Sequence, residues 1–156
     1  NIYFEPVDVP ASLRLEKGFR VWGSDVTPET TPDEAGLGFC VRLDKPGGFV
    51  GDAALRAARD VGAVRTMRCI RIDDPARVVL GGEPVLVDGE PVARVTSGGY
   101  GYTLRASLAY AYLPIGLAAI GTRVRVMLFG EPADAEVVSL PALWTALAGS
   151  TPSVAG

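Results

Sequence analysis

Side chains suited to chemistry are few in this chain of 156 residues, and histidine is absent. Without histidine there can be no Ser-His-Asp or Cys-His nucleophile pair, no histidine-bound zinc and no histidine general base. Acid–base chemistry would fall to carboxylates, Tyr, Lys or a partner molecule. The adjacent acids Asp33-Glu34 and Asp73-Asp74 are typical of solvated turns or helix caps, and no His or Cys is placed to join them as metal ligands. We therefore expect no metal site.

The cysteines are predicted to be inert. Cys40 and Cys69 are the two in the chain, and they lie far apart, in apolar runs and outside any Cys-x-x-Cys pattern. Free cysteine is among the most buried residue types, so we expect two buried thiols. A disulfide between them is not indicated by the spacing, but it stays open.

Composition limits the classes of partner. The net charge of −3 and the pI near 5.0 argue against a nonspecific nucleic-acid surface, which is usually strongly basic. The longest apolar stretches fall short of the roughly 20 residues that a membrane-spanning helix needs, and no secretory signal pattern is evident. We predict a globular protein with no nucleic-acid or membrane partner, and the cytoplasm is its default location.

Residues 11–62 are predicted to form loops and short helices. One helix begins at Ala11 and is interrupted at Gly18, and the apolar run 39–43 predicts a strand. The clearest helix of the chain is expected over 52–61, because it is rich in strong helix formers and a glycine follows it.

The second half of the chain is predicted to be a compact β module over residues 63–148. Asp88-Gly89 is a strong hairpin signal. Short strand-like runs at close spacing, without a helix between them, indicate a small antiparallel barrel or sandwich. These runs are 66–72, 78–80, 85–87, 92–96, 107–113, 123–129 and 133–140. The expected fold class is α+β, mainly β.

Three further predictions concern the two ends of the chain and residues 11–62. Residues 1–10 are predicted to be an extended lead-in, and its first residues are similar to a protease-site scar. A last helical turn is expected over 142–148 and a frayed tail over 149–156. Residues 11–62 are too short to hold a core of their own, so we expect them to be the end of a larger unit.

Four sequence blocks, in the correct order, resemble the glycine-cleavage T-protein (aminomethyltransferase) family. Residues 12–25, SLRLEKGFRVWGSD, are similar to LRLE-x-G-x-x-x-[YW]-G-x-D, and residues 31–39, TPDEAGLGF, to TP-x-EAGLG-[WF]. Residues 45–55, KPGGFVGDAAL, are similar to K-x-x-[DF]-F-[IV]-G-x-x-AL. Residues 95–114, VTSGGYGYTLRASLAYAYLP, are similar to VTSG-x-[YS] followed by a Thr and [IL]A-[YL]-AY-[LV]. The resemblance covers about residues 12–140.

One branch of the family is the most similar. Trp22, the run Glu16-Lys17-Gly18 and the last block resemble the C-terminal folate-binding portion of dimethylglycine and sarcosine dehydrogenases and their bacterial relatives. In that branch a flavin domain oxidises an N-methyl amine, and the T-protein-like portion passes the one-carbon unit to tetrahydrofolate. A tRNA-modification branch carries a Cys in the loop that matches residues 45–52, and its absence here disfavours that branch.

The resemblance implies both a fold and a division of labour. Residues 11–62 would be the end of a folate-binding α+β lobe, and residues 63–148 a small antiparallel, Greek-key-like β-barrel. The family's earlier part, with the Asp credited with contacting the folate ring, has no match here, and neither has a flavin Gly-x-Gly-x-x-Gly fingerprint. We therefore expect tetrahydrofolate as the ligand and FAD only in a missing N-terminal domain. We also expect no catalytic residue here and no activity of this chain alone, with the missing domains as its partners.

The resemblance implies four candidate folate contacts. Phe19 and Phe39 match aromatic positions near folate, and an aromatic face can hold a flat pteridine by stacking worth about 0.5–1.5 kcal/mol. Arg14 could bind a glutamate carboxylate of folate, and Tyr100 lies in a Gly-flanked loop that could line a cleft. Other interpretations stay open: the aromatic residues as ordinary packing, and an internal salt bridge for Arg14.

The leading functional prediction is the C-terminal part of a tetrahydrofolate-dependent aminomethyltransferase-like protein of one-carbon metabolism, which helps to form the folate pocket. The alternative is a non-catalytic structural or docking barrel without folate binding. A third hypothesis, a demethylase that uses another methyl donor, is not separable by sequence because substrate choice would lie in the missing lobes.

Overall fold

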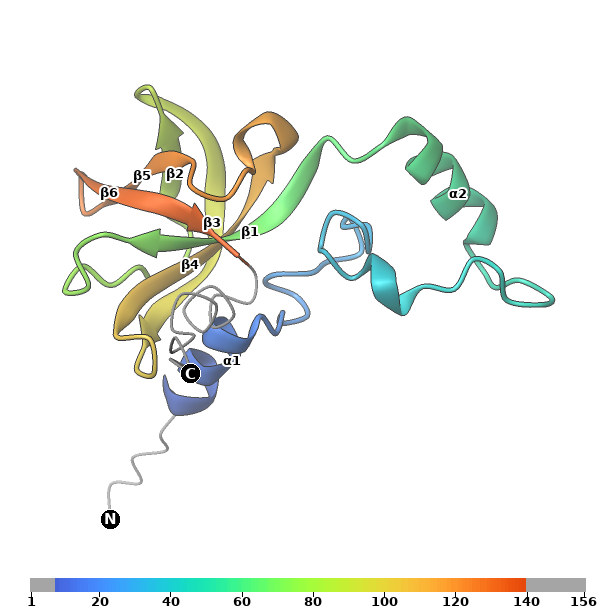
Figure 1. Ribbon diagram of the computed structural model, residues 1–156, viewed down its shortest axis with the longest axis horizontal. Helices are drawn as coiled ribbons and strands as arrows, with labels where there is room; N and C mark the ends of the chain where they lie inside the picture. The colour runs from blue at the N-terminus through green and yellow to red at the C-terminus, as the bar shows by residue number, and fades with distance from the viewer. Residues whose placement is uncertain (1–7, 140–156) are drawn as a thin grey trace, which may run out of the picture.

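The computed structural model describes residues 8–139, with side chains from Ser12 onward, as a closed β-barrel with an arm at its side (Figure 1). The arm is residues 18–64, and the barrel is residues 65–138. Helix α1 (Asp8–Lys17) lies against the barrel, and the arm carries η1 (Gly38–Cys40) and α2 (Asp52–Val61) away from it. Among the described residues, no helix is long and apolar enough to cross a membrane.

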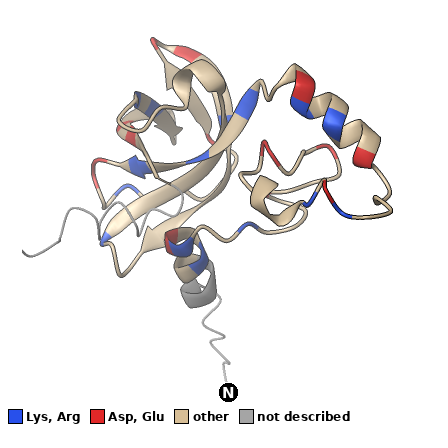
Figure 2. Cartoon of the chain, turned by 45° about the vertical axis from the view of Figure 1, so that its right-hand side comes forward, with Lys and Arg blue, Asp and Glu red and all other residues tan. Residues whose placement is uncertain are grey.

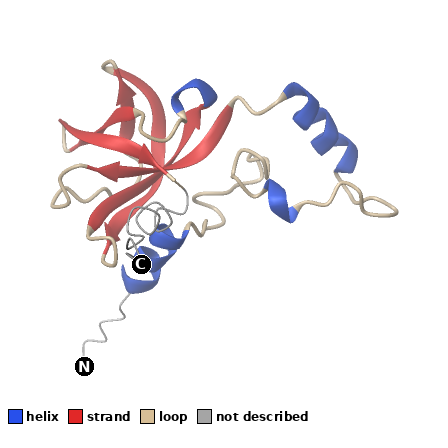
Figure 3. Ribbon diagram, in the orientation of Figure 1, coloured by secondary structure: helices blue, strands red, loops and turns tan. Residues whose placement is uncertain are grey.

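Within the described chain, antiparallel strands close the barrel in the order β1-β4-β3-β2-β5-β6. The hairpins β2–β3 and β3–β4 follow each other, and β5 returns to lie beside β2, which is a Greek-key connection. The predicted mainly β fold with a small antiparallel, Greek-key-like barrel is confirmed (Figure 3). The strands are β1 (Arg65–Ile72), β2 (Pro84–Val87), β3 (Glu90–Gly101), β4 (Ala106–Pro114), β5 (Arg123–Leu128) and β6 (Glu131–Val138), with the short helix η2 (Ile115–Leu117) after β4.

The Asp88-Gly89 turn joins β2 to β3, as predicted. Both residues have positive φ, 52° and 87°, which is the conformation that a two-residue turn of this twist requires. The apolar run 78–80 is not a strand, although Val79 is fully buried in the barrel core.

Strand β4 is buried on both faces. Ala109, Ala111 and Leu113 belong to the cluster that fills the barrel, while Leu108 and Tyr110 belong to a second cluster with Leu15 of α1. Successive side chains of a strand point to opposite faces, so a strand covered on both sides reads as one apolar run. Helix α1 therefore forms the outer layer over this part of the barrel.

The glycine-rich segment after Thr96 is strand, where the sequence predicted a loop. β3 continues to Gly101, because its glycines let other segments approach closely. A Cβ at Gly98 would lie 2.4 Å from the carbonyl oxygen of Val79, and one at Gly99 would lie 3.0 Å from Leu15 Cδ1.

Two other local predictions are wrong. The run 39–43 is not a strand: Gly38–Cys40 form a 3-10 turn, and in the arm the residues after it pair with no described strand. The extended lead-in predicted over 1–10 is helical from Asp8, which begins α1. The predicted helical turn over 142–148 and the tail over 149–156 lie outside the described residues.

The cysteines differ from each other. Cys69 is fully buried in β1, as predicted, and burial raises the pKa of its thiol to about 12. Cys40 was predicted to be buried as well and is exposed, because the arm does not fold over η1. Both thiols are free.

The arm has little core of its own. Helix α2 begins and ends as predicted, between Gly51 and Gly62, but none of its residues is buried. Charges of both signs lie along α2 and its neighbouring loops, as Figure 2 shows. A helix this short is marginal in water by itself, so its order in the arm depends on tertiary contacts.

Candidate functional site

The two predicted aromatic contacts both lie in the arm and face solvent. Phe19 is 64% exposed and Phe39 is 83% exposed. Neither ring packs in the core of the described chain, and packing against other parts of the protein stays an open interpretation. Large exposed aromatic faces are suited to contact with a ligand or another protein surface.

The segments that carry these two phenylalanines meet around Arg20. The Arg20 guanidinium donates from Nη1 to the carbonyl oxygen of Gly18, and its Nη2 lies 2.9 Å from the position a Cβ would take at Gly36. Cys40, next to Phe39, is close enough to interact with it electrostatically. Burial lowers the pKa of Arg20, and the nearby Tyr110 and Tyr112 oppose that change.

Arg14 forms the internal salt bridge that the sequence left open as its alternative role. Its Nη1 donates to Asp25 Oδ2 at 2.8 Å and to the carbonyl oxygen of Phe19 at 3.3 Å, and its Nη2 donates to Ser97 Oγ at 2.8 Å. The side chain is 20% exposed. Arg14 therefore holds the segment before Phe19 against β3, and its role as a folate contact stays a prediction.

Asp25 is the buried anchor of the arm. Its side chain is fully buried, and besides Arg14 it accepts hydrogen bonds from Thr96 Oγ1 at 2.7 Å and from the backbone N–H of Val21 at 2.9 Å. Tyr112 Oη donates to the Asp25 carbonyl oxygen at 2.7 Å. A buried carboxylate is tolerated only when it is paired in this way. The arm is consequently fixed to the barrel by polar contacts.

Tyr100 lies elsewhere, at the end of the β3–β4 hairpin. Its ring meets Tyr102 edge to face, with centroids 5.2 Å apart and an interplanar angle of 74°. Glu16 of α1 holds the following turn, because its Oε1 accepts from the backbone N–H groups of Thr103 and Leu104 at 2.7 and 2.9 Å. The turn that follows Tyr100 is thus held by α1, whereas Phe39 belongs to η1 in the arm.

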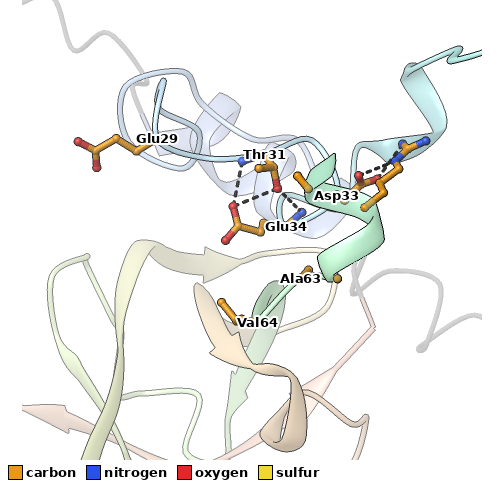
Figure 4. Close-up of a pocket in the computed structure, with 9 residues that line it drawn as sticks. Glu29, Thr31, Asp33, Glu34, Ala63 and Val64 are labelled. Carbon is orange, nitrogen blue, oxygen red and sulfur yellow. Dashed lines mark hydrogen bonds and ion pairs between the residues drawn. The ribbon is translucent and has the colours of Figure 1, made fainter. Parts of the chain in front are cut away.

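A cavity of about 540 Å³ opens between the arm and the linker into β1 (Figure 4). Asp33 forms a bidentate pair with Arg59 of α2, with N–O distances of 2.7 and 2.9 Å. Glu34 exchanges hydrogen bonds with Thr31 and pairs with Arg65 of β1 at 2.8 Å. The cavity is lined by Glu29, Thr31, Asp33, Glu34, Ala58, Arg59, Gly62, Ala63 and Val64, which include none of the four predicted folate contacts.

The acidic pair Asp33-Glu34 therefore works as a structural joint. Burial disfavours the charge of Glu34, but hydrogen bonds from Thr31 and Arg65 outweigh it and hold its pKa below the ordinary value. Within residues 8–139, no three of His, Cys, Asp and Glu gather as a metal site would require.

Comparison with known proteins assigns the family. Residues 65–143, just over half of the chain, match the glycine cleavage T-protein C-terminal barrel domain, and residues 7–45 match the GCVT N-terminal domain. This chain belongs to the glycine cleavage T-protein family. The predicted resemblance is confirmed, and the barrel described above is the family's C-terminal barrel.

Named relatives of this T-protein family member fall in both groups that the sequence suggested. It is 38% identical to mouse (Mus musculus) mitochondrial dimethylglycine dehydrogenase over 134 residues, 86% of this chain and 15% of that protein. It is also 38% identical to the aminomethyltransferase of Synechococcus sp. (strain WH7803) over 130 residues, 83% of this chain and 35% of the relative. The crystal structure of glycine cleavage system aminomethyltransferase T from Bartonella henselae superposes with a TM-score of 0.78 at 31% identity, over 85% of this chain and 37% of that one. The chain thus spans about a third or less of the curated relatives it matches.

Sequence reasoning missed the polar residues that arrange this surface. Arg20 and Asp25 lie inside the first recognised block. Nothing in their spacing predicts that Asp25 is fully buried and paired with Arg14, or that Arg20 forms no ion pair with a described residue. Their roles depend on Thr96 and Gly36, which are distant in the chain.

Proposed function

We propose that this chain is the C-terminal part of a tetrahydrofolate-dependent protein of one-carbon metabolism, and that its arm forms one wall of the folate site. Family membership and the relatives named as aminomethyltransferase and dimethylglycine dehydrogenase support the proposal. The reaction would be the transfer of a one-carbon unit from an aminomethyl or flavin-generated iminium donor to tetrahydrofolate. FAD, where the donor requires it, would be bound by another domain. The mouse relative is named as mitochondrial, and a cytoplasmic location for this chain stays a prediction.

The observation that carries the proposal is the pair of exposed rings, Phe19 and Phe39, on segments that meet around Arg20. A pteridine is flat and polar, so it fits an aromatic platform with hydrogen-bonding groups nearby. Arg14 would act by holding the segment of Phe19 in place, or by reaching a folate carboxylate as first predicted. Tyr100 would contribute from the hairpin beside α1.

A second function, docking without folate binding, is favoured by a different observation. Helix α2 has no buried residue, and Val50, Val61 and Val64 are 103%, 85% and 76% exposed. Large exposed apolar side chains of this kind are typical of a protein–protein contact. The expected cover is the preceding lobes of the same protein, which the family fold implies.

Calorimetry with 5-formyltetrahydrofolate separates the two functions. If the arm forms a folate wall, Phe39→Ala and Phe19→Ala each weaken binding about 3- to 10-fold, because stacking is worth about 0.5–1.5 kcal/mol. Phe129→Ala is the matched control, because Phe129 is 93% exposed in the β5–β6 turn, away from the arm (Figure 1).

Two outcomes would contradict the proposal. Absent or millimolar binding that neither arm substitution changes favours docking alone. Turnover of dimethylglycine or sarcosine by this chain alone contradicts the division of labour, in which the catalytic carboxylate lies in an earlier lobe.

A further inference from the structure

Arg20 differs from the other arginines around this surface because its donors are largely unused. Its Nε is buried without a hydrogen-bond partner, and it forms no ion pair with any described residue. Nη1 donates to the Gly18 carbonyl oxygen, and Nη2 has no hydrogen-bond acceptor among the described residues. A buried polar group without a partner is destabilising and calls for an explanation.

The contrast with Arg14 locates the unused donors. Both terminal nitrogens of Arg14 are bonded, to Asp25 and Ser97, whereas the Nε–Nη2 edge of Arg20 has no acceptor among the described residues. That edge is the planar fork that binds the two oxygens of a carboxylate side by side. An arginine without an acidic partner is therefore suited to receive one.

The residues around Arg20 indicate which kind of ligand could accept its hydrogen bonds. Phe19 precedes it in the chain, and Gly36 and Cys40 bring the segment of Phe39 against it. The absence of a side chain at Gly36 lets Nη2 pack closely against that backbone, since a Cβ there would lie only 2.9 Å from it. A ligand bound here would meet exposed aromatic faces and a guanidinium fork together.

We propose that Arg20 is the receptor for a carboxylate carried by an aromatic ligand that binds across Phe19 and Phe39. The assignment rests on the proposed function, since folates are one member of this ligand class, but it names a residue that the resemblance does not. Arg14 is kept for the arm's attachment to β3, and Arg20 supplies the charge that selects an anion. An acidic side chain of another domain would offer the same carboxylate, and the test separates the two sources.

The probe is 4-aminobenzoyl-L-glutamate, compared with its uncharged diamide, in NMR titrations of the full chain. We expect the wild-type protein to bind the dicarboxylate about tenfold more tightly than the diamide, because a charge-assisted fork is lost with the charge. Arg20→Gln should remove that preference without changing the affinity for the diamide, and Arg20→Lys should keep part of it. Arg42→Gln is the control, since Arg42 is an exposed arm residue paired with Asp44.

Folding of the variants is checked by their unfolding midpoints. Arg20→Gln should lower the midpoint little, because the side chain it replaces forms no ion pair with a described residue and a single hydrogen bond, to the Gly18 carbonyl oxygen. A dicarboxylate preference that survives in Arg20→Gln overturns the assignment. A lower midpoint with an unchanged preference also overturns it, because the guanidinium would then act in folding and not in ligand binding. If the wild-type chain binds 5-formyltetrahydrofolate and Arg20→Gln keeps the preference for the dicarboxylate, the role of Arg20 is wrong but the proposed function stands. If the wild-type chain does not bind 5-formyltetrahydrofolate, the proposed function itself is wrong.

Discussion

The barrel and the arm place their apolar side chains in opposite ways. Ile70 and Leu113 in the barrel are fully buried, whereas Phe39, Val50 and Val61 in the arm are 83–103% exposed. Burying a large apolar side chain contributes about 1.5–3 kcal/mol, and the arm gains almost none of this. Its order comes from polar joints instead, at Asp25 and at the Asp33-Glu34 pair. The comparison shows that one chain can order one region by apolar packing and another by polar contacts.

The two free cysteines test this difference with the largest expected effect. Cys40 lies exposed in the arm, and Cys69 lies buried in β1 with its pKa raised to about 12. Because a thiolate must be both formed and accessible, we expect Cys40 to react with iodoacetamide on the order of 10³-fold faster or more. Peptide mapping by mass spectrometry during labelling at pH 8 measures both rates. Comparable rates would mean that the barrel opens locally.

Matched truncations compare the two regions energetically. Leu113→Ala should lower the free energy of unfolding by about 2–5 kcal/mol, because it removes packed volume from the barrel interior. Val61→Ala should change it by less than about 0.5 kcal/mol, because Val61 is 85% exposed. Urea denaturation of the two variants measures both values. If Val61→Ala lowered the free energy of unfolding as much as Leu113→Ala, the Val61 side chain would have to be buried in solution, which would contradict the comparison.

A single added methyl group tests how closely the barrel is packed. Gly98→Ala should cost about 1–3 kcal/mol, because its Cβ would lie 2.4 Å from the Val79 carbonyl oxygen and the backbone must move. Gly116→Ala is the control, since a Cβ there would have no atom of the described chain within 4 Å beyond its immediate neighbours. Thermal unfolding of both variants measures the difference. Equal stabilities would mean that the 78–80 segment shifts freely.

Acid should weaken the joint between arm and barrel, with the smallest effect of the series. The pKa of Glu34 in the folded protein lies below its ordinary value of 4.5, so its contribution is fully present above 4.5 and is lost as the pH falls through the lower value. Glu34→Gln should therefore cost less than about 1 kcal/mol at pH 7, and this cost should shrink as the pH falls below 4.5. Unfolding measured from pH 7 to pH 3 gives the profile. Glu29→Gln, at the same cavity, should leave the profile unchanged.

Local patterns predicted the barrel well and the arm less well. The Asp88-Gly89 turn and the alternating run after Arg65 are confirmed as parts of β2, β3 and β1, because turn chemistry and period-two alternation are local properties. The run 39–43 has the composition of a strand but finds no described partner, and the glycines of β3 are extended because α1 and Val79 approach them. Such outcomes depend on neighbours that a window of sequence does not contain.

By itself, the sequence determined the family and the mainly β class, since strand periodicity, turn residues and the four family blocks are all written in consecutive residues. The tertiary structure decided which candidate side chains are free to bind. It paired Arg14 with Asp25, left Arg20 without an ion pair to any described residue and turned Phe19 and Phe39 to solvent. Exposure and ion pairing are set by segments far apart in the chain, as when Asp25 meets Thr96, and so they arise only when the fold brings those segments together.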